Sequence, residues 1–224
     1  MPWQKNIKEF FKNNHSKIVV IPGFIASDHK NNTTTLGRGG SDFTGAIFAN
    51  AVNAKVLEIW TDVSGMFTAN PQIVKQAKPI EKISYQEAME LSHFGAKVIY
   101  TPTLRPVYKA RIPVLVKNSF NPESKGTLIN GDNSGTGRSP IKGISSIDHV
   151  DLITLQGPGM VGVTGTSARL FGALAKSGVN IILITQASSE YSITFAVSPS
   201  DAAAASEAIT AEFEREIILN KELR

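Results

Sequence analysis

A cluster of glycines at residues 35–42 places the strongest constraint on how this 224-residue chain folds. The segment reads Thr-Leu-Gly-Arg-Gly-Gly-Ser-Asp, and apolar residues follow it at helical spacing from Phe43 to Ala51. Glycines let backbone N–H groups approach an anion closely, and a helix that begins at Ser41 adds the positive end of its dipole. Arg38 supplies a planar fork that binds a carboxylate or a phosphate through two hydrogen bonds. The pattern predicts one half of a phosphoryl-transfer site, although a lone glycine pair more often marks only a tight turn.

Helical and strand-like patterns alternate before and after this cluster. Residues 7–11 have the spacing of a short amphipathic helix, and residues 17–22 and 55–60 have the apolar character of buried strands. Between them, residues 27–35 are polar and predict a loop. The order helix, strand, helix, strand is typical of a parallel α/β sheet with crossover connections.

A second alternation runs from residue 71 to residue 138. Ser84 and Glu87 have the spacing of a capping box, which predicts a helix from there to about residue 95. A further helix is expected over 104–110, and a strand over 114–116. Residues 118–138 are rich in Asn, Gly, Ser and Pro and predict a loop or linker. We therefore expect one domain over residues 1–130, and a linker with a second domain over residues 131–224.

The second domain has a different rhythm. Its predicted order is β-α-β-β-α, which is most of a ferredoxin-like α+β unit. The strands are expected at residues 152–155, 179–185 and 191–197, and the helices at residues 167–177 and 201–216. A closing strand is expected after Glu216, but residues 217–219 are short for one. Residues 142–147 are a further candidate strand, whose free edge would pair with another copy of the chain.

Composition excludes several classes of function. The net charge of +4 is mild, and no run of basic residues is interleaved with aromatics, so a nucleic-acid partner is not expected. The chain has no cysteine, and its four histidines lie too far apart for metal-ligand spacing, so no metal site is expected. It has no apolar run long enough to span a bilayer and no signal-peptide pattern, so we expect a cytoplasmic protein without a membrane partner.

Two further segments carry residues suited to nucleotide binding. Thr61, Asp62 and Phe67 follow a predicted strand, and ligands of α/β sheets bind past the carboxyl ends of strands. Phe67 could cover an aromatic base, and Thr61 and Asp62 could form hydrogen bonds with it. Taken alone, however, a Thr-Asp turn usually has no role beyond reversing the chain. Lys97 lies beside a glycine and could neutralise charge that develops on a phosphate. In isolation, a lysine such as Lys97 is more often a solvated residue at the end of a helix, where the dipole favours it.

Three motifs together resemble the second half of the aspartokinase catalytic domain, which has the amino-acid kinase fold. They are the glycine cluster at 35–42, Trp-Thr-Asp-Val at 60–63 and Phe-Gly-Ala-Lys-Val at 94–98. They occur in the order found in the family and cover roughly residues 18–130. The resemblance implies an α/β fold with a partial amino-acid-kinase-like parallel sheet and flanking helices.

The resemblance also implies roles for individual residues. In the family, the residue that matches Arg38 holds the substrate carboxylate. The residues that match Ser41 and Asp42 lie at the phosphate-transfer centre. The resemblance also implies that Ser41 contacts the substrate. Mg-ATP and L-aspartate would be the ligands, and this chain itself would hold no resident metal. The residues expected to contact the nucleotide are Gly39, Gly40, Thr61, Asp62, Phe67, Gln72, Lys97 and Val98.

The sequence departs from the family pattern in three places. Phe67 stands where the family usually has tyrosine, and Gln72 stands where it usually has an arginine that contacts phosphate. The Lys-Phe-Gly-Gly-Thr-Ser motif that supplies a catalytic lysine in the family is absent. Phosphoryl transfer needs charge neutralisation from several sides. We therefore expect that the chain starts inside the catalytic domain and has negligible kinase activity alone.

Residues 150–216 resemble an ACT domain, the amino-acid-sensing module of aspartokinases. Read without that context, the segment offers only a glycine-rich turn and a polar hairpin loop. Lysine-regulated members carry an acidic residue where Ile182 stands, and the run at 186–192 resembles threonine-sensitive aspartokinase–homoserine dehydrogenases, so threonine is the expected effector. In the family, effectors bind where ACT units pair, which implies a homo-oligomer. The residues expected to contact the effector are Met160, Val163, Asn180, Ile181, Gln186, Ser189 and Glu190.

Two readings of the function follow. In the first, the parent protein is an aspartate kinase, which phosphorylates the side-chain carboxylate of L-aspartate at the start of lysine, threonine and methionine biosynthesis under feedback control. In the second, the chain is a catalytically inactive regulatory fragment that senses an amino acid. A related kinase for glutamate, uridylate or carbamate is a weaker alternative, because the ACT-like unit argues against it.

Overall fold

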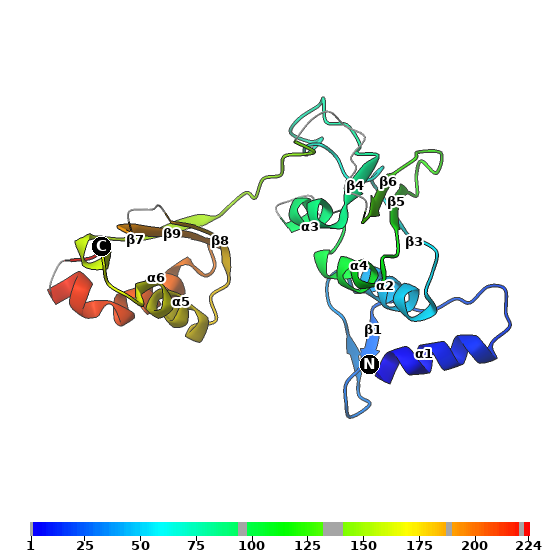
Figure 1. Ribbon diagram of the computed structural model, residues 1–224, viewed down its shortest axis with the longest axis horizontal. Helices are drawn as coiled ribbons and strands as arrows, with labels where there is room; N and C mark the ends of the chain where they lie inside the picture. The colour runs from blue at the N-terminus through cyan, green and yellow to red at the C-terminus, as the bar shows by residue number, and fades with distance from the viewer. Residues whose placement is uncertain (1, 94–97, 132–140, 187–189, 220–221) are drawn as a thin grey trace. The chain divides into compact units, whose positions relative to one another are not determined.

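The computed structural model describes residues 2–93, 98–131, 141–186, 190–219 and 222–224. The chain divides into two compact units, Met1–Ser146 and Ile147–Arg224 (Figure 1). No helix within the described ranges is both long enough and apolar enough to cross a membrane.

The first unit is built on a four-stranded sheet in the order β3-β5-β6-β4 (Figure 1). Its strands are β3 (Leu57–Thr61), β4 (Lys82–Ser84), β5 (Val114–Asn118) and β6 (Thr127–Asn130). The β3/β5 and β4/β6 pairs are parallel, but β5 and β6 run antiparallel. The expectation of a wholly parallel sheet, with a loop over residues 118–138, is therefore wrong at β6. Residues 119–126 are too few for a crossover helix, so the chain can only turn back beside β5.

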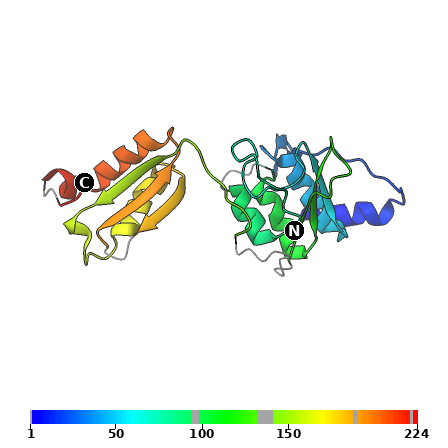
Figure 2. The ribbon, with the colours of Figure 1, turned by 90° about the horizontal axis from the view of Figure 1, so that it is seen from above.

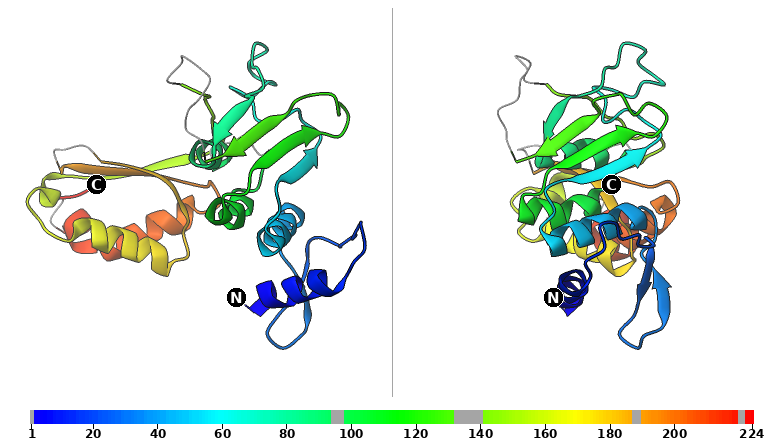
Figure 3. Two further views of the ribbon diagram at one scale, coloured as in Figure 1. Left: turned by 45° about the vertical axis from the view of Figure 1, so that its right-hand side comes forward. Right: turned by 90° about the vertical axis from the view of Figure 1, so that its right-hand side faces the viewer.

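Three helices cover one face of this sheet: α2 (Gly40–Val52), α3 (Tyr85–His93) and α4 (Leu104–Ala110) (Figure 3). The short helix η1 (Thr101–Thr103) leads into α4. The predicted capping box at the start of α3 is confirmed, since Ser84 N donates to Glu87 Oε2 at 2.9 Å and Glu87 N donates to Ser84 Oγ at 3.2 Å. The core beneath the helices includes the buried residues Ala46, Ile59, Ile83, Ala88, Leu104, Val107, Val114, Val116 and Ile129.

The N-terminal segment differs from expectation in one respect. The predicted helix is present as α1 (Pro2–Asn13), which contacts α2 through Gln4 Nε2 and Asn50 Oδ1 at 2.9 Å. Residues 17–22 were expected to be a buried strand, and this is wrong. Ile18 is 81% exposed and Val20 is 91% exposed. An apolar run becomes a buried strand only beside a neighbouring strand, and none in the described part of the chain pairs with this segment.

A two-stranded hairpin replaces part of the polar loop that was expected at residues 27–35. Strands β1 (Ile25–Ser27) and β2 (Thr33–Thr35) pair antiparallel. The turn between them is closed by the Asp28 carboxylate, which accepts hydrogen bonds from the backbone N–H groups of Lys30 and Asn32. An aspartate that bonds its own backbone two residues on is a common turn former. The hairpin leads directly into the glycine cluster.

The second unit has the expected β-α-β-β-α order. Strands β7 (Asp151–Gln156), β8 (Ile181–Gln186) and β9 (Ser192–Val197) form an antiparallel sheet in the order β7-β9-β8. Helices α5 (Thr166–Lys176) and α6 (Ala202–Glu212) lie side by side on one face of the sheet (Figures 2 and 3). The short helix η2 (Pro158–Met160) forms the turn after β7. The core between sheet and helices includes the buried residues Leu155, Leu170, Leu174, Ile193, Phe195, Val197, Ile209 and Phe213.

The closing strand that was expected after Glu216 is not present among the described residues, and no strand is found at residues 217–219 or 222–224. Residues 217–219 lie in the π-helical segment η3 (Arg215–Leu219). The chain then returns to the edge of β7, where Gln156 and Arg224 exchange two backbone hydrogen bonds of 2.9 and 2.8 Å. The other candidate strand, at 142–147, is wrong: the structure has no strand over residues 141–149. Ile144 N instead donates to Thr68 O at 2.8 Å in the first unit.

Candidate functional site

The glycine cluster forms the tight turn that starts helix α2. Gly39 is the N-cap of α2 in the left-handed conformation, with φ of 71°, and no side chain caps this end. Gly40 N donates to Gly37 O at 3.0 Å, which closes the turn. The first-turn N–H groups of an uncapped helix point outward with the positive end of the dipole. The glycine cluster therefore has the local geometry that the predicted anion-binding helix start requires.

Phe24 supports the loop and was missed by sequence reasoning. Its backbone has a φ of 74°, which is rare outside glycine. Its N–H donates to Thr44 Oγ1 at 3.1 Å, and its carbonyl accepts from Leu36 N at 2.9 Å. Thr44 Oγ1 in turn donates to Gly40 O at 2.8 Å. These bonds fasten the segment after Pro22 to the first turn of α2, and the Pro-Gly pair at 22–23 was the only sequence signal for this bend.

A hollow of about 320 Å³ opens beside the start of α2. It brings together four residues that the sequence predicted for the site, namely Arg38, Gly39, Asp42 and Val98. Its other lining residues are Ser92, Ile99, Tyr100 and Thr101, which sequence reasoning did not single out. The hollow thus joins the glycine cluster to the segment that follows the Phe-Gly-Ala-Lys-Val motif.

Two polar groups in this hollow are in unusual environments. Burial raises the pKa of the Asp42 carboxyl above its ordinary value, because the charged form loses hydration. Ser92 Oγ is buried and has no hydrogen-bond partner among the residues that the structure describes. Buried polar atoms are nearly always bonded, so an unpartnered hydroxyl is an exception that calls for a physical cause.

The other predicted nucleotide contacts that the structure describes do not line this hollow. Thr61 ends β3, where its Oγ1 donates to Asp62 Oδ1 at 3.1 Å. Phe67 forms an isolated bridge with Pro79, and Gln72 is exposed in the turn that begins at Asn70. Gly40 is buried and Ser41 is exposed at the start of α2, and neither is among the lining residues. Lys97 lies outside the described residues.

The residues predicted for effector binding are spread over the second unit, with Asn180 and Ile181 at the start of β8 and Gln186 at its end. Met160 is buried in the core, whereas Val163, Asn180 and Gln186 are exposed and Ile181 is half-buried. Glu190 Oε2 accepts a hydrogen bond from Gly162 N at 3.2 Å, so it contacts the loop that precedes α5. Ser189 lies outside the described residues.

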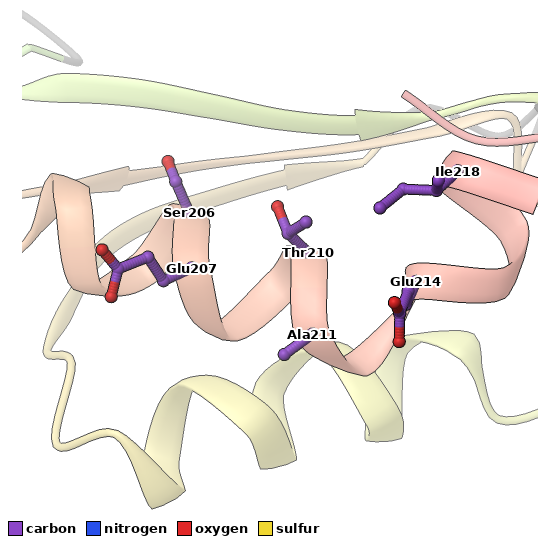
Figure 4. A pocket seen from close by; sticks show the side chains of 6 residues that line it. All are labelled: Ser206, Glu207, Thr210, Ala211, Glu214 and Ile218. Carbon is purple, nitrogen blue, oxygen red and sulfur yellow. The ribbon is translucent and has the colours of Figure 1, made fainter.

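A larger hollow of about 460 Å³ runs along α6 and η3 in the same unit, and it includes none of the predicted effector residues (Figure 4). Its lining residues are Ser206, Glu207, Thr210, Ala211, Glu214 and Ile218. Among the residues that the structure places, no group of three or more acidic or histidine side chains could hold a metal ion.

The sequences of both units match known protein families. The model of the amino acid kinase family matches residues 4–118, and an ACT domain model matches residues 153–213. The chain belongs to the amino acid kinase family, and it carries an ACT domain after the kinase-like unit.

Its relatives are aspartokinases, which confirms the resemblance expected from the three motifs. The chain is 41% identical over 214 residues to the chloroplastic bifunctional aspartokinase/homoserine dehydrogenase 1 of Arabidopsis thaliana, covering 94% of this chain and 24% of that protein. It is 42% identical over 201 residues to the bifunctional enzyme of Haemophilus influenzae, covering 90% and 24%. The chain therefore spans about a quarter of the length of these relatives.

Solved aspartokinase structures share the fold. Aspartokinase III of Escherichia coli, in complex with aspartate and ADP, has a TM-score of 0.62 and 38% identity, covering 79% of this chain and 38% of that one. The aspartate kinase of Clostridium acetobutylicum has a TM-score of 0.57 and 29% identity, covering 94% and 66%. The predicted fold class, an α/β kinase-like unit followed by an ACT domain, is confirmed by these neighbours and by the two family matches.

Proposed function

We propose that this chain forms one wall of the active site of an aspartate kinase, together with the ACT module that regulates it. The observation that carries the proposal is the hollow beside α2, where Arg38 and Asp42 lie with the uncapped helix start. A guanidinium and a helix N-terminus on the same hollow suit a carboxylate and a phosphoryl group that meet there. The related E. coli enzyme binds aspartate and ADP.

Each residue of the wall has a role in this proposal. Arg38 binds the carboxylate of L-aspartate in bidentate fashion, and the N–H groups at Ser41 and Asp42 face the transferred phosphoryl group. Thr61, Asp62, Phe67, Gln72, Lys97 and Val98 contact the nucleotide. The parent activity is transfer of the γ-phosphoryl group of ATP to the side-chain carboxylate of aspartate, which starts the biosynthesis of lysine, threonine and methionine.

Magnesium enters as part of the nucleotide. Asp42 is the only carboxylate among the described lining residues of the hollow, so the described chain offers Mg²⁺ one carboxylate ligand there. This fits an ion held mainly by phosphate oxygens and water, as is usual for Mg²⁺ in kinases. A cation near Asp42 would also favour the ionised carboxylate, which burial disfavours in the free chain.

Threonine is the proposed effector of the ACT module. The proposed location is the cytoplasm, where the chain works as a homo-oligomer. The apolar Ile182 offers no partner for the ammonium group of a lysine effector, which supports threonine over lysine. Titration calorimetry of the chain with each amino acid tests this assignment. Binding of threonine, weakened by Asn180→Ala, is expected, whereas binding of lysine alone would reject it.

The second candidate is a regulatory fragment without kinase function. Its support is the ACT domain, whose model matches residues 153–213. Under either reading, the 224-residue chain alone is expected to give no aspartate-dependent ADP release. The two readings differ in whether the residues around the hollow beside α2 support kinase activity when the rest of a kinase active site is supplied.

A chimera separates them. Residues 1–224 replace the matching segment of the H. influenzae bifunctional enzyme, and ADP release is measured by a coupled assay with L-aspartate and, as a control, L-glutamate. Aspartate-dependent turnover supports the kinase proposal. A folded chimera that releases no ADP with aspartate supports the regulatory reading instead.

A further inference from the structure

The hydroxyl of Ser92 stands out among the polar groups of the first unit. Ser92 is near the end of α3 and lines the hollow beside α2, yet its Oγ is buried and has no hydrogen-bond partner in the described part of the chain. A buried hydroxyl that lacks a partner opposes folding by the desolvation of an unmade bond. The unpaired hydroxyl brings the free protein little benefit. A ligand that accepts its hydrogen bond, and that is not part of the free chain, would explain why a hydroxyl stands at this position.

The composition of the hollow indicates what that partner is. Arg38 supplies a cationic fork, Gly39 and the uncapped start of α2 supply a positive dipole end, and Thr101 adds a second hydroxyl. Hydroxyl groups donate to anionic oxygens as readily as they accept, and such charge-assisted bonds are shorter and stronger than neutral ones. The surroundings therefore favour a ligand oxygen that carries negative charge.

We propose that Ser92 is a ligand-binding residue of this hollow, whose hydroxyl donates to an anionic oxygen that Arg38 also attracts. The shared chemistry is an oxyanion, which is either a phosphate oxygen of the nucleotide or a carboxylate oxygen of the amino-acid substrate. This inference rests on the proposed function for the identity of the ligand, but not for the existence of the site. It adds a contact from α3 to the contacts expected from the glycine cluster.

Thr103 provides a matched control within the same unit. Its Oγ1 is the other buried side-chain atom without a partner among the described residues, and Thr103 is fully buried. Unlike Ser92, it is not among the lining residues of the hollow. Removing either hydroxyl relieves an unsatisfied group in the free chain, but only Ser92 is a lining residue of the hollow.

The test compares Ser92→Ala, Thr103→Val and Arg38→Ala with the unaltered chain. Each is titrated calorimetrically with ADP, sodium pyrophosphate and L-aspartate in separate arms, and the melting temperature is measured without ligand. Ser92→Ala is expected to bind at least one probe about tenfold more weakly, a loss of about 1.4 kcal/mol. Thr103→Val is expected to bind all probes within about twofold of the unaltered chain. The arm that is weakened tells whether phosphate or carboxylate is the partner of Ser92.

Three results would overturn the inference. The first is binding by Ser92→Ala within about twofold in every arm, and the second is an equal loss in Thr103→Val. The third is an unaltered chain that binds none of the probes. If Arg38→Ala loses binding while Ser92→Ala keeps it, the inference fails and the proposed function stands. An inactive chimera alongside a Ser92-dependent loss would reject the kinase proposal and leave the oxyanion site in place.

Discussion

The side chain of Tyr100 lies directly against the backbone of Gly39. A Cβ atom built on Gly39 would lie 2.3 Å from Tyr100 Cβ and 2.4 Å from Tyr100 Cγ, distances that real atoms do not adopt. Gly39 also has a φ of 71°, which side chains rarely tolerate. This contact fixes the helix start of α2 against the segment that follows α3, and it forms one corner of the hollow.

The first prediction uses this contact. Gly39→Ala is expected to lose about 1–2 kcal/mol from backbone strain and about 1–3 kcal/mol more from overlap with Tyr100. Gly37→Ala is the matched control, because Gly37 has a φ of 73° with nothing within 4 Å of a built Cβ. Urea unfolding of both variants measures the difference. Equal losses of stability in the two variants would show that the Tyr100 contact is not rigid.

The second prediction concerns the pH dependence of Asp42. Because burial raises the folded-state pKa of its carboxyl above the ordinary value of 3.8, protonation favours the folded state. That stability is present below pH 3.8 and is lost as the pH rises through the raised folded-state pKa. Asp42→Asn should therefore raise the melting temperature at pH 7 and make little difference below pH 3.8. Asp62→Asn, at an exposed position, is the control, and a lower melting temperature for Asp42→Asn at pH 7 would contradict the prediction.

The third prediction concerns Arg169, which joins α5 to the end of α6. Its guanidinium donates to Glu212 Oε1 at 2.9 Å, Glu216 Oε1 at 2.7 Å and the Glu212 carbonyl at 2.8 Å, and lies 4.4 Å from the ring of Phe213. Since these groups are partly solvated, Arg169→Ala is expected to cost only about 1 kcal/mol, measured by urea unfolding at pH 7. The exposed Lys125–Glu81 pair offers a control, Lys125→Ala, with no expected loss.

The same cluster gives a pH signature. Hydrogen bonding to Arg169 lowers the pKa of the Glu216 carboxyl below its ordinary value of 4.5. Stability from a lowered pKa is present above the unfolded value and is lost as the pH falls through the folded one. The difference between the unaltered chain and Arg169→Ala should therefore shrink below pH 4.5. A difference that stays constant down to pH 3 would assign the effect to packing on Phe213 instead.

The fourth prediction concerns oligomer formation through the second unit. Strand β8 lies at an edge of its sheet, and Leu183 and Ile184 on it are 48% and 49% exposed. An exposed apolar edge strand is a template for pairing with another chain. Leu183→Lys should shift the chain toward monomer in sedimentation velocity runs, whereas Leu152→Lys on β7 should not. A chain that is monomeric without substitution would reject pairing by β8.

Much of the fold could be predicted because local signals and tertiary contacts agree. The capping box of Ser84 and Glu87 set the start of α3, and the apolar runs at β3, β5 and β9 became the centres of the two cores. The predictions failed for segments whose conformation depends on residues far away in the sequence. Residues 17–22 have the apolar character of a buried strand, but no described strand lies beside them, and β6 was hidden in a segment with loop-like composition.

The candidate site was predictable only where its residues share a motif. The glycine cluster identified Arg38, Gly39 and Asp42, which the structure brings into one hollow with Val98. Ser92 and Tyr100 are unremarkable by residue type, because their role depends on how α3 and the segment after it pack against the start of α2. Phe24 was equally hidden, since its positive φ is set by bonds to Thr44 and Leu36 rather than by its own preference.

The most direct test of the central claim is the kcat/KM for L-aspartate of the chimera with H. influenzae enzyme, measured with and without Arg38→Ala. Loss of a bidentate charged contact to substrate should lower kcat/KM about 10- to 100-fold while the chimera stays folded. That result would place Arg38 in a working substrate site supplied by this chain. An Arg38→Ala chimera that keeps the kcat/KM of the unaltered chimera would contradict the account.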